Sequence, residues 1–142
     1  MTMLRGIDPL LTPDLLHSLA SMGHGDRIAI VDANFGAAGR ARRVHYVSGS
    51  DASSVLRAVL SLMPLDDFSE DAAVTMQVVG DTSAVPPAAA DFATILDIHD
   101  GPAPVAIERS AFYDMAGAAF AVVQTGERRL YGNIILTKGV IR

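Results

Sequence analysis

The chain has 142 residues, which is enough to bury a hydrophobic core, so we predict a single domain over residues 1–142. Half of the residues are hydrophobic and 19% are charged, which is typical of a compact globular protein and excludes a disordered one. The net charge of −5 argues against nucleic acid as a partner, and the lack of cysteine excludes disulfides and thiolate catalysis.

Apolar residues occur in short runs, although the mean hydropathy is as high as +0.32. The longest runs, residues 28–31 and 116–123, fall far short of the roughly 20 residues that a membrane-spanning helix needs, so we expect no membrane partner. We therefore assign the surplus apolar surface to the core and to a subunit interface. The first 13 residues lack the apolar stretch of a signal peptide, which predicts a cytoplasmic location.

Helices and strands are predicted to alternate along the chain. Thr12 can cap a first helix that Gly23 ends, and Pro64 ends a second helix that begins at Ser50 or Asp51. The alternation predicts an α/β fold, a single-domain layered fold with a mainly parallel central sheet flanked by helices. In chain order we predict a helix over 12–22, strands over 28–31 and 45–47, a helix over 51–63, a strand over 74–79, a helix over 88–99, a strand over 105–107, a helix over 109–117, and strands over 118–123 and 133–137.

His24 lies between two glycines, in a tight loop between the first helix and the first strand. A histidine in such a loop can act as a general acid or base near neutral pH. The alternative is a structural histidine that is hydrogen-bonded to the backbone.

Asp32 follows the apolar strand 28–31, and Asn34 lies two residues further on. In open α/β sheets, ligands bind beyond the carboxyl ends of the strands. A carboxylate and an amide there can accept and donate hydrogen bonds, as sugar hydroxyls require. The alternative is an ordinary turn, in which Asp and Asn are common.

Two further polar groups flank predicted strands. Arg109 follows the strand 105–107 and can bind a hydroxyl pair or an anion, or else form a surface ion pair. Tyr131, Gly132 and Asn133 precede the last strand, where Gly132 would let the backbone approach a ligand between a phenol and an amide. The alternative for residues 131–133 is an ordinary turn that leads into the strand.

Motifs for cofactors and metals are absent from the sequence. It has no glycine-rich dinucleotide or phosphate loop after a strand and no histidine spacing typical of zinc, so we expect neither cofactor nor metal.

Taken together, these segments resemble the ribose/fucose mutarotase family over essentially the whole chain. Within that family the glycines at 25 and 132 are similar to the fucose branch, whereas Gly36 replaces a proline and is expected to loosen the loop beside Asp32. The segments that carry the resemblance are Met22-Gly23-His24-Gly25-Asp26, Asp32-Ala33-Asn34-Phe35, Arg109-Ser110-Ala111-Phe112-Tyr113, Thr125-Gly126-Glu127 and Tyr131-Gly132-Asn133-Ile134.

The resemblance implies an isomerase that interconverts the α and β anomers of a pyranose, with L-fucose as the expected monosaccharide. His24 would match the family's general acid. Our hypothesis is that Asp32 also orients His24, and that Tyr131 transfers a proton or binds a hydroxyl. The resemblance implies sugar-binding roles for Asp32, Arg109, Tyr131 and Asn133, and a ring-shaped homo-oligomer, typically a decamer, with sites near subunit contacts. The alternatives are a mutarotase for D-ribose or another sugar, a non-catalytic sugar-binding accessory protein, and an assembly subunit with a degenerate site.

Overall fold

The computed structural model describes residues 4–142, so the first three residues of the predicted domain lie outside it. Its helices are α1 (Pro13–Ser21), α2 (Ala52–Leu60), α3 (Pro87–Ile98) and α4 (Arg109–Ala118), with one 3₁₀ turn, η1 (Ala37–Gly39). Its strands are β1 (Arg27–Val31), β2 (Val44–Val47), β3 (Ala73–Met76), β4 (Val105–Ile107), β5 (Ala121–Thr125) and β6 (Ile134–Thr137).

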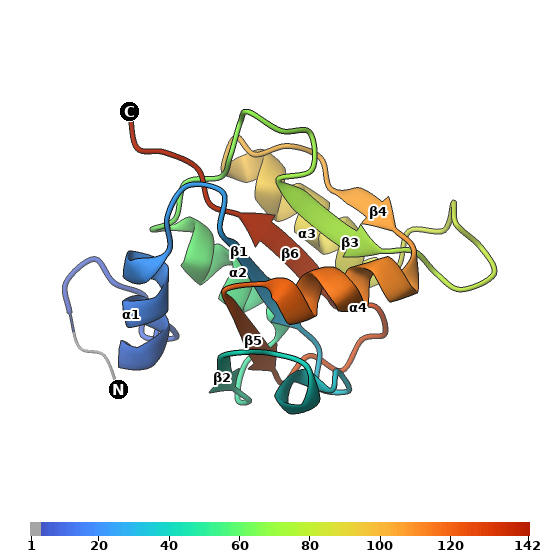
Figure 1. The fold of residues 1–142 in the computed structure, drawn as a ribbon, viewed down its shortest axis with the longest axis horizontal. Helices are drawn as coiled ribbons and strands as arrows, with labels where there is room; N and C mark the ends of the chain where they lie inside the picture. Colours follow the sequence, from blue (N-terminus) through green and yellow to red (C-terminus); the bar gives the residue numbers. More distant parts are fainter. Residues whose placement is uncertain (1–3) are drawn as a thin grey trace.

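All six strands join one sheet in the order β2-β5-β1-β6-β3-β4. The β2–β5, β5–β1 and β3–β4 pairs are parallel, which confirms the predicted mainly parallel sheet. The last strand, β6, is antiparallel to both of its neighbours, β1 and β3 (Figure 1). The carboxyl ends of the other five strands therefore lie at the same edge of the sheet as the start of β6.

Helices cover both faces of the sheet, with α4 on one face and α1, α2 and α3 on the other (Figure 1). Alternate residues of β1 face the two layers, as expected for a strand that is buried on both sides. Ile28 and Ile30 pack with the three-helix side, whereas Ala29 and Val31 pack with Phe112 of α4. No helix of residues 4–142 has the length and apolar character needed to cross a membrane.

Helix ends follow the local sequence. The Thr12 side chain accepts a hydrogen bond from the Leu15 amide at the start of α1, as predicted from its capping position. At the other end of α1, the Lys138 ammonium group donates to the carbonyl oxygens of Leu19 and Met22. A cation at this position also favours the negative end of the helix dipole.

Two strands differ from their predicted bounds by more than one residue. The strand predicted over 118–123 begins only at Ala121, since α4 runs to Ala118 and the Phe120 amide donates to the Arg27 carbonyl in the connection. The strand predicted over 74–79 ends at Met76, because the Val79 amide donates to the Tyr131 hydroxyl and not to a neighbouring strand.

The loop after Asp32 contains a tight turn centred on Gly36. Its backbone has φ −81° and ψ 61°, and the Ala37 amide donates to the Phe35 carbonyl at 3.0 Å. These are the features of an inverse γ-turn, whose φ lies close to the range that proline adopts. A Cβ at Gly36 would meet no atom within 4 Å.

Replacing Gly36 with proline is therefore expected to stabilise the protein. Proline would restrict the unfolded chain without changing the turn, which is typically worth about 0.4–1 kcal/mol. Thermal unfolding of Gly36→Pro should show a higher midpoint than wild type. A lower midpoint would mean that the Gly36 turn is not the one described here.

Candidate active site

A pocket of about 210 Å³ lies at the edge of the sheet where the parallel strands end. Residues from four separate chain segments line it, which brings together most of the polar residues singled out in the sequence. The lining residues are Asp32, Asn34, Phe35, Met76, Arg109, Tyr113, Leu130, Tyr131 and Asn133. Asp32, Arg109, Tyr131 and Asn133, to which the resemblance assigned sugar-binding roles, thus line one pocket.

Asp32 and Asn133 form the floor of this pocket, and both are almost fully buried. The Asn133 amide oxygen accepts from the Asp32 backbone N–H at 2.8 Å, and its Nδ2 donates to Asp32 Oδ2 at 3.2 Å. Burial raises the pKa of the Asp32 carboxyl above its ordinary value, although hydrogen bonds from Asn34 and Asn133 oppose this. A buried carboxylate with a raised pKa is typical of a functional site.

Tyr131 has a left-handed backbone, with φ 58°, which is uncommon for a residue with a side chain. Its hydroxyl oxygen accepts a hydrogen bond from the Val79 amide at 3.1 Å. Because the oxygen accepts this bond, the phenolic O–H stays able to donate to a ligand.

Gly132 does not line the pocket, unlike its two neighbours. A Cβ at this position would lie 2.6 Å from Glu127 Cγ and 3.1 Å from the Arg129 carbonyl oxygen. The lack of a side chain at Gly132 therefore serves close packing against the loop that precedes it.

Arg109 and Tyr113 form one wall of the pocket. The Arg109 Nη2 donates to the Tyr113 hydroxyl at 3.4 Å, and the Tyr113 ring packs against Phe35 at 5.1 Å between centroids. The guanidinium of Arg40 lies 4.3 Å from the centroid of the same ring. Glu108 caps α4 by accepting from the Ser110 and Ala111 amides, and these bonds lower the pKa of its carboxyl.

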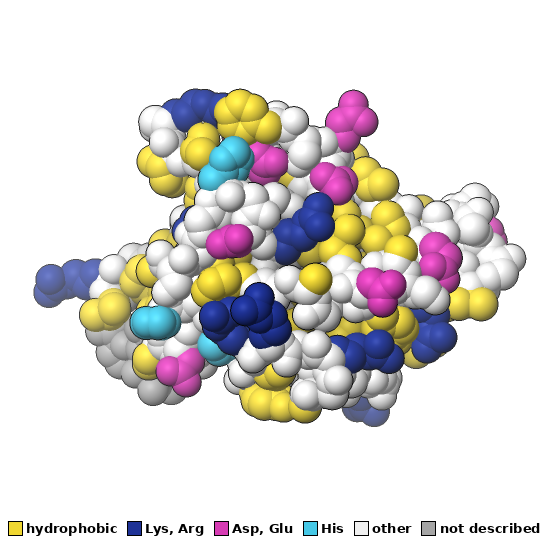
Figure 2. Space-filling model, in the orientation of Figure 1, with side chains coloured by type: hydrophobic (Ala, Val, Ile, Leu, Met, Phe, Trp, Pro, Cys, Tyr) yellow, Lys and Arg dark blue, Asp and Glu magenta, His cyan; other side chains and the backbone are white. Residues whose placement is uncertain are grey.

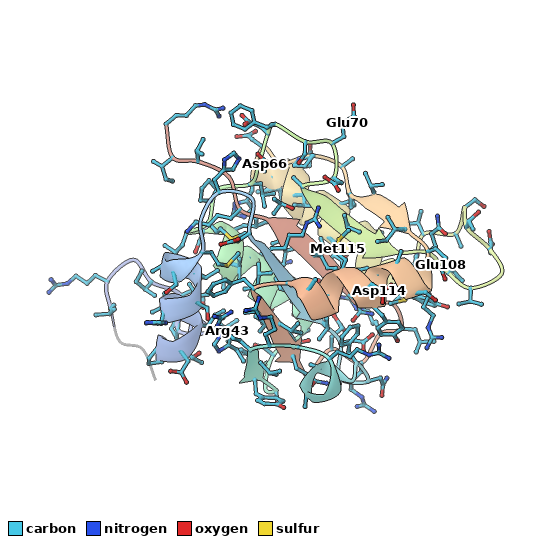
Figure 3. All side chains as sticks on the ribbon, in the orientation of Figure 1. Arg43, Asp66, Glu70, Glu108, Asp114 and Met115 are labelled. Atoms are coloured by element: carbon cyan, nitrogen blue, oxygen red, sulfur yellow. The ribbon has the colours of Figure 1, made fainter. Side chains whose placement is uncertain are left out.

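His24 lies at the opposite edge of the sheet, before β1, whereas Asp32 follows β1. The five residues of β1 separate them by roughly 16 Å at about 3.3 Å per residue. The expectation that Asp32 orients His24 is therefore wrong within one chain. In Figure 3, Asp66, which contacts His24, and Glu108, which precedes Arg109, lie on different sides of the molecule.

Asp66 is the group that holds His24. Its Oδ1 lies 3.0 Å from His24 Nε2, and the Phe68 ring lies 5.3 Å from the His24 ring. Hydrogen bonds from the Ser69 hydroxyl, from His24 and from the Phe68 amide lower the pKa of the Asp66 carboxyl to about 2. An ionised carboxylate can only accept hydrogen bonds, so His24 Nε2 donates to Asp66, and the His24 side chain stays about half exposed.

The sequence analysis missed Asp66, Tyr113 and the ion pair of Glu127 with Arg129. Asp66 is 42 residues from His24, so no local spacing indicates their contact. Within residues 4–142, no three His, Asp or Glu side chains are grouped so that they could hold a metal ion.

The sequence also matches a known protein family. Residues 5–141 match the family described as the RbsD / FucU transport protein family. The chain belongs to this family. The match confirms the family that the sequence motifs indicated, and it spans all the pocket residues as well as His24 and Asp66.

Individual members of the family were also compared. The chain is 39% identical to the fucose mutarotase of Bos taurus, over 99% of this chain and 96% of that protein. It is 35% identical to the Streptococcus pneumoniae fucose mutarotase solved in complex with L-fucose, with a TM-score of 0.92 over 98% and 100% of the two chains. Bacillus subtilis RbsD complexed with D-ribose is 22% identical, with a TM-score of 0.73 over 99% and 100%, and shares the fold.

Replacing Asp66 with asparagine is expected to remove a pH-dependent contribution to stability. Folding lowers the pKa of this carboxyl from 3.8 to about 2, so its stabilising effect is complete above pH 3.8 and is lost as the pH falls towards 2. The difference in free energy of unfolding between wild type and Asp66→Asn should be constant above about pH 5 and shrink below about pH 4.

Urea denaturation at a series of pH values measures this difference. Glu70→Gln is a suitable control, because Glu70 lies on the same loop and points to solvent (Figure 3). A difference for Asp66→Asn that does not change with pH would contradict the described hydrogen bonds.

Proposed function

We propose that this chain is a sugar mutarotase that interconverts the α and β anomers of L-fucose. The observation that carries the proposal is the pocket at the carboxyl edge, where a buried carboxylate, an amide, a phenol and a guanidinium converge. Full-length identity to the fucose mutarotase of Bos taurus, and the fold shared with the Streptococcus pneumoniae enzyme that was solved with L-fucose, support this substrate class.

The chemistry needs only proton transfers and a polar pocket. The sugar ring opens when its ring oxygen gains a proton and the anomeric hydroxyl loses one, and it closes again after rotation about the C1–C2 bond. Positioned acid and base groups typically give about 10²- to 10⁴-fold acceleration, or roughly 3–5 kcal/mol. The side chains of this chain supply such groups without a cofactor.

Each pocket residue has a role that fits its contacts. The buried Asp32 carboxylate and the Asn133 amide hold sugar hydroxyls, and Arg109 donates to a further hydroxyl pair. The Tyr131 hydroxyl accepts from the Val79 amide, so its own proton is directed to the sugar. No histidine, the side chain best suited to proton transfer near neutral pH, lines this pocket in one chain.

His24 of a neighbouring subunit supplies this missing group in our proposal. His24 and the pocket lie at opposite edges of the sheet, so a head-to-tail contact between two copies brings them together. Contacts of this heterologous kind close into rings, which supports the predicted ring-shaped homo-oligomer, proposed here as a decamer. The Asp66 carboxylate then holds the His24 ring, which gives a proton to the sugar ring oxygen on opening and takes it back on closure.

Exposed apolar side chains near His24 support this contact. Phe68, which packs on His24, is 70% exposed, and Ile141 is 80% exposed. Leu62, Val140 and Ile141 line the same groove as Asp66. Figure 2 shows hydrophobic side chains beside a histidine at this rim of the molecule. A cytoplasmic location is part of the same proposal, and cell fractionation tests it.

The catalytic role predicts the effect of His24→Gln. Saturation-transfer NMR between the anomeric protons of L-fucose should show faster exchange with wild type, and about a 100-fold or greater loss with His24→Gln. His17→Gln is the control, since this exposed histidine of α1 lines neither the pocket nor the groove beside Asp66. D-ribose run in parallel tests the alternative substrate. Binding of L-fucose without faster exchange would instead support a sugar-binding accessory protein.

The shared site predicts that two inactive variants complement each other. His24→Gln and Asp32→Asn, mixed in equal amounts and refolded together, should regain about a quarter of wild-type activity, since half of the neighbours on each side are intact. A site formed within one chain would give no more than the sum of the two parent activities. The mixture should also elute well above the 14.9 kDa of a single chain on size exclusion.

A further inference from the structure

The loop between β5 and β6 carries two of the pocket residues, Tyr131 and Asn133. It contains a left-handed residue at Tyr131 and a tightly packed Gly132, so its conformation is not one that a free loop would favour. Contacts from outside the pocket must therefore hold it.

Glu127 is the central group of these contacts, and its side chain is almost fully buried. Its carboxylate accepts three hydrogen bonds from Arg129: from the backbone N–H at 3.1 Å, from Nε at 3.2 Å and from Nη2 at 2.8 Å. These bonds lower the pKa of the Glu127 carboxyl, which keeps it ionised despite burial. The Cγ of the same side chain fills the space that Gly132 leaves open.

Arg129 connects the loop to two helices on the far side of the pocket floor. Its Nη1 donates to Asp91 of α3 at 2.5 Å, and its Nη2 donates to the Ser53 hydroxyl of α2 at 3.0 Å. One guanidinium thus binds the buried carboxylate and both helices at once. A lysine has no such planar fork and can satisfy only part of this set.

Glu127 also ties the loop to the end of β1. Its carbonyl oxygen accepts from the Ala33 amide at 2.8 Å, and its own amide donates to the Thr125 hydroxyl at 3.1 Å. The Thr125 hydroxyl in turn donates to the Val31 carbonyl at 2.8 Å. The backbone on both sides of Asp32 is therefore fixed to the same loop that carries Tyr131 and Asn133.

We propose that Glu127 and Arg129 are a positioning pair for the sugar site, which sets the Tyr131 hydroxyl and the Asn133 amide relative to Asp32. Neither residue lines the pocket, so the pair acts through the loop and not by contact with the sugar. The effect on activity rests on the mutarotase function proposed above, whereas the effect on the loop does not. A displacement of about 1 Å in a catalytic group can cost about 100-fold in rate.

Arg129→Met is the first test variant. It should lower kcat/KM for L-fucose anomer exchange by about tenfold or more, at a temperature where the assembly stays intact. It should also raise amide hydrogen exchange in residues 126–134, as measured by mass spectrometry. Arg129→Lys should fall between Arg129→Met and wild type in both measurements, and it decides the test alone if the methionine variant does not fold.

Arg57→Met is the control. Arg57 is an exposed arginine of α2 that lines neither the pocket nor the groove beside Asp66. It should change neither kcat/KM nor the exchange of residues 126–134, even where it lowers the unfolding midpoint.

Two results would overturn the proposal. The first is unchanged hydrogen exchange of residues 126–134 in both Arg129 variants. The second is faster amide hydrogen exchange of residues 126–134 in a variant whose kcat/KM equals that of wild type. The pair would then support the loop without affecting catalysis. If wild type does not accelerate anomer exchange, the mutarotase proposal fails. In that case the Arg129 variants are compared with wild type in two measurements, the dissociation constant of L-fucose and the amide hydrogen exchange of residues 126–134. If either value is unchanged, the positioning role is overturned.

Discussion

The antiparallel strand β6 between β1 and β3 is the constraint on which the rest of the site depends. β5 lies on one side of β1 and β6 on the other, so the loop that joins them must pass over the end of β1. This crossing brings Asn133 against Asp32 and stacks two chain segments at the carboxyl edge. With β6 parallel to its neighbours, Asn133 would lie at the opposite edge and the pocket would lose its floor.

Three buried acidic residues show how differently the fold treats carboxylates. Asp66 and Glu127 receive several donors each, and their pKa values are lowered as a result. Asp32 is buried with weaker compensation, so its pKa is raised and its charged form costs free energy. The carboxyl whose burial is least offset is the one that lines the pocket, as expected where local stability is lost in favour of ligand binding.

Local features of the sequence predicted much of the fold and part of the site. Caps such as Thr12 and apolar runs such as β1 depend on neighbouring residues, so helix and strand positions followed from the chain alone. The antiparallel direction of β6 was not predicted, although its eight-residue connection to β5 is shorter than the dozen or so residues that a parallel crossover needs. Asp66 was also missed, since its contact with His24 joins residues 42 positions apart. Asp32, Arg109 and Asn133 were singled out because polar residues beside apolar strands stand out in the sequence.

Because His24 and Asp32 lie at opposite ends of β1, the proposed enzymatic activity depends on protein concentration. In the proposed head-to-tail arrangement an isolated chain carries two incomplete halves, and only association makes a working centre. By mass action, activity per chain then falls on dilution below the dissociation constant of the ring, whereas a self-contained enzyme keeps its specific activity. A defective copy would also impair its neighbour, so a minority of faulty subunits would lower the output of the whole population.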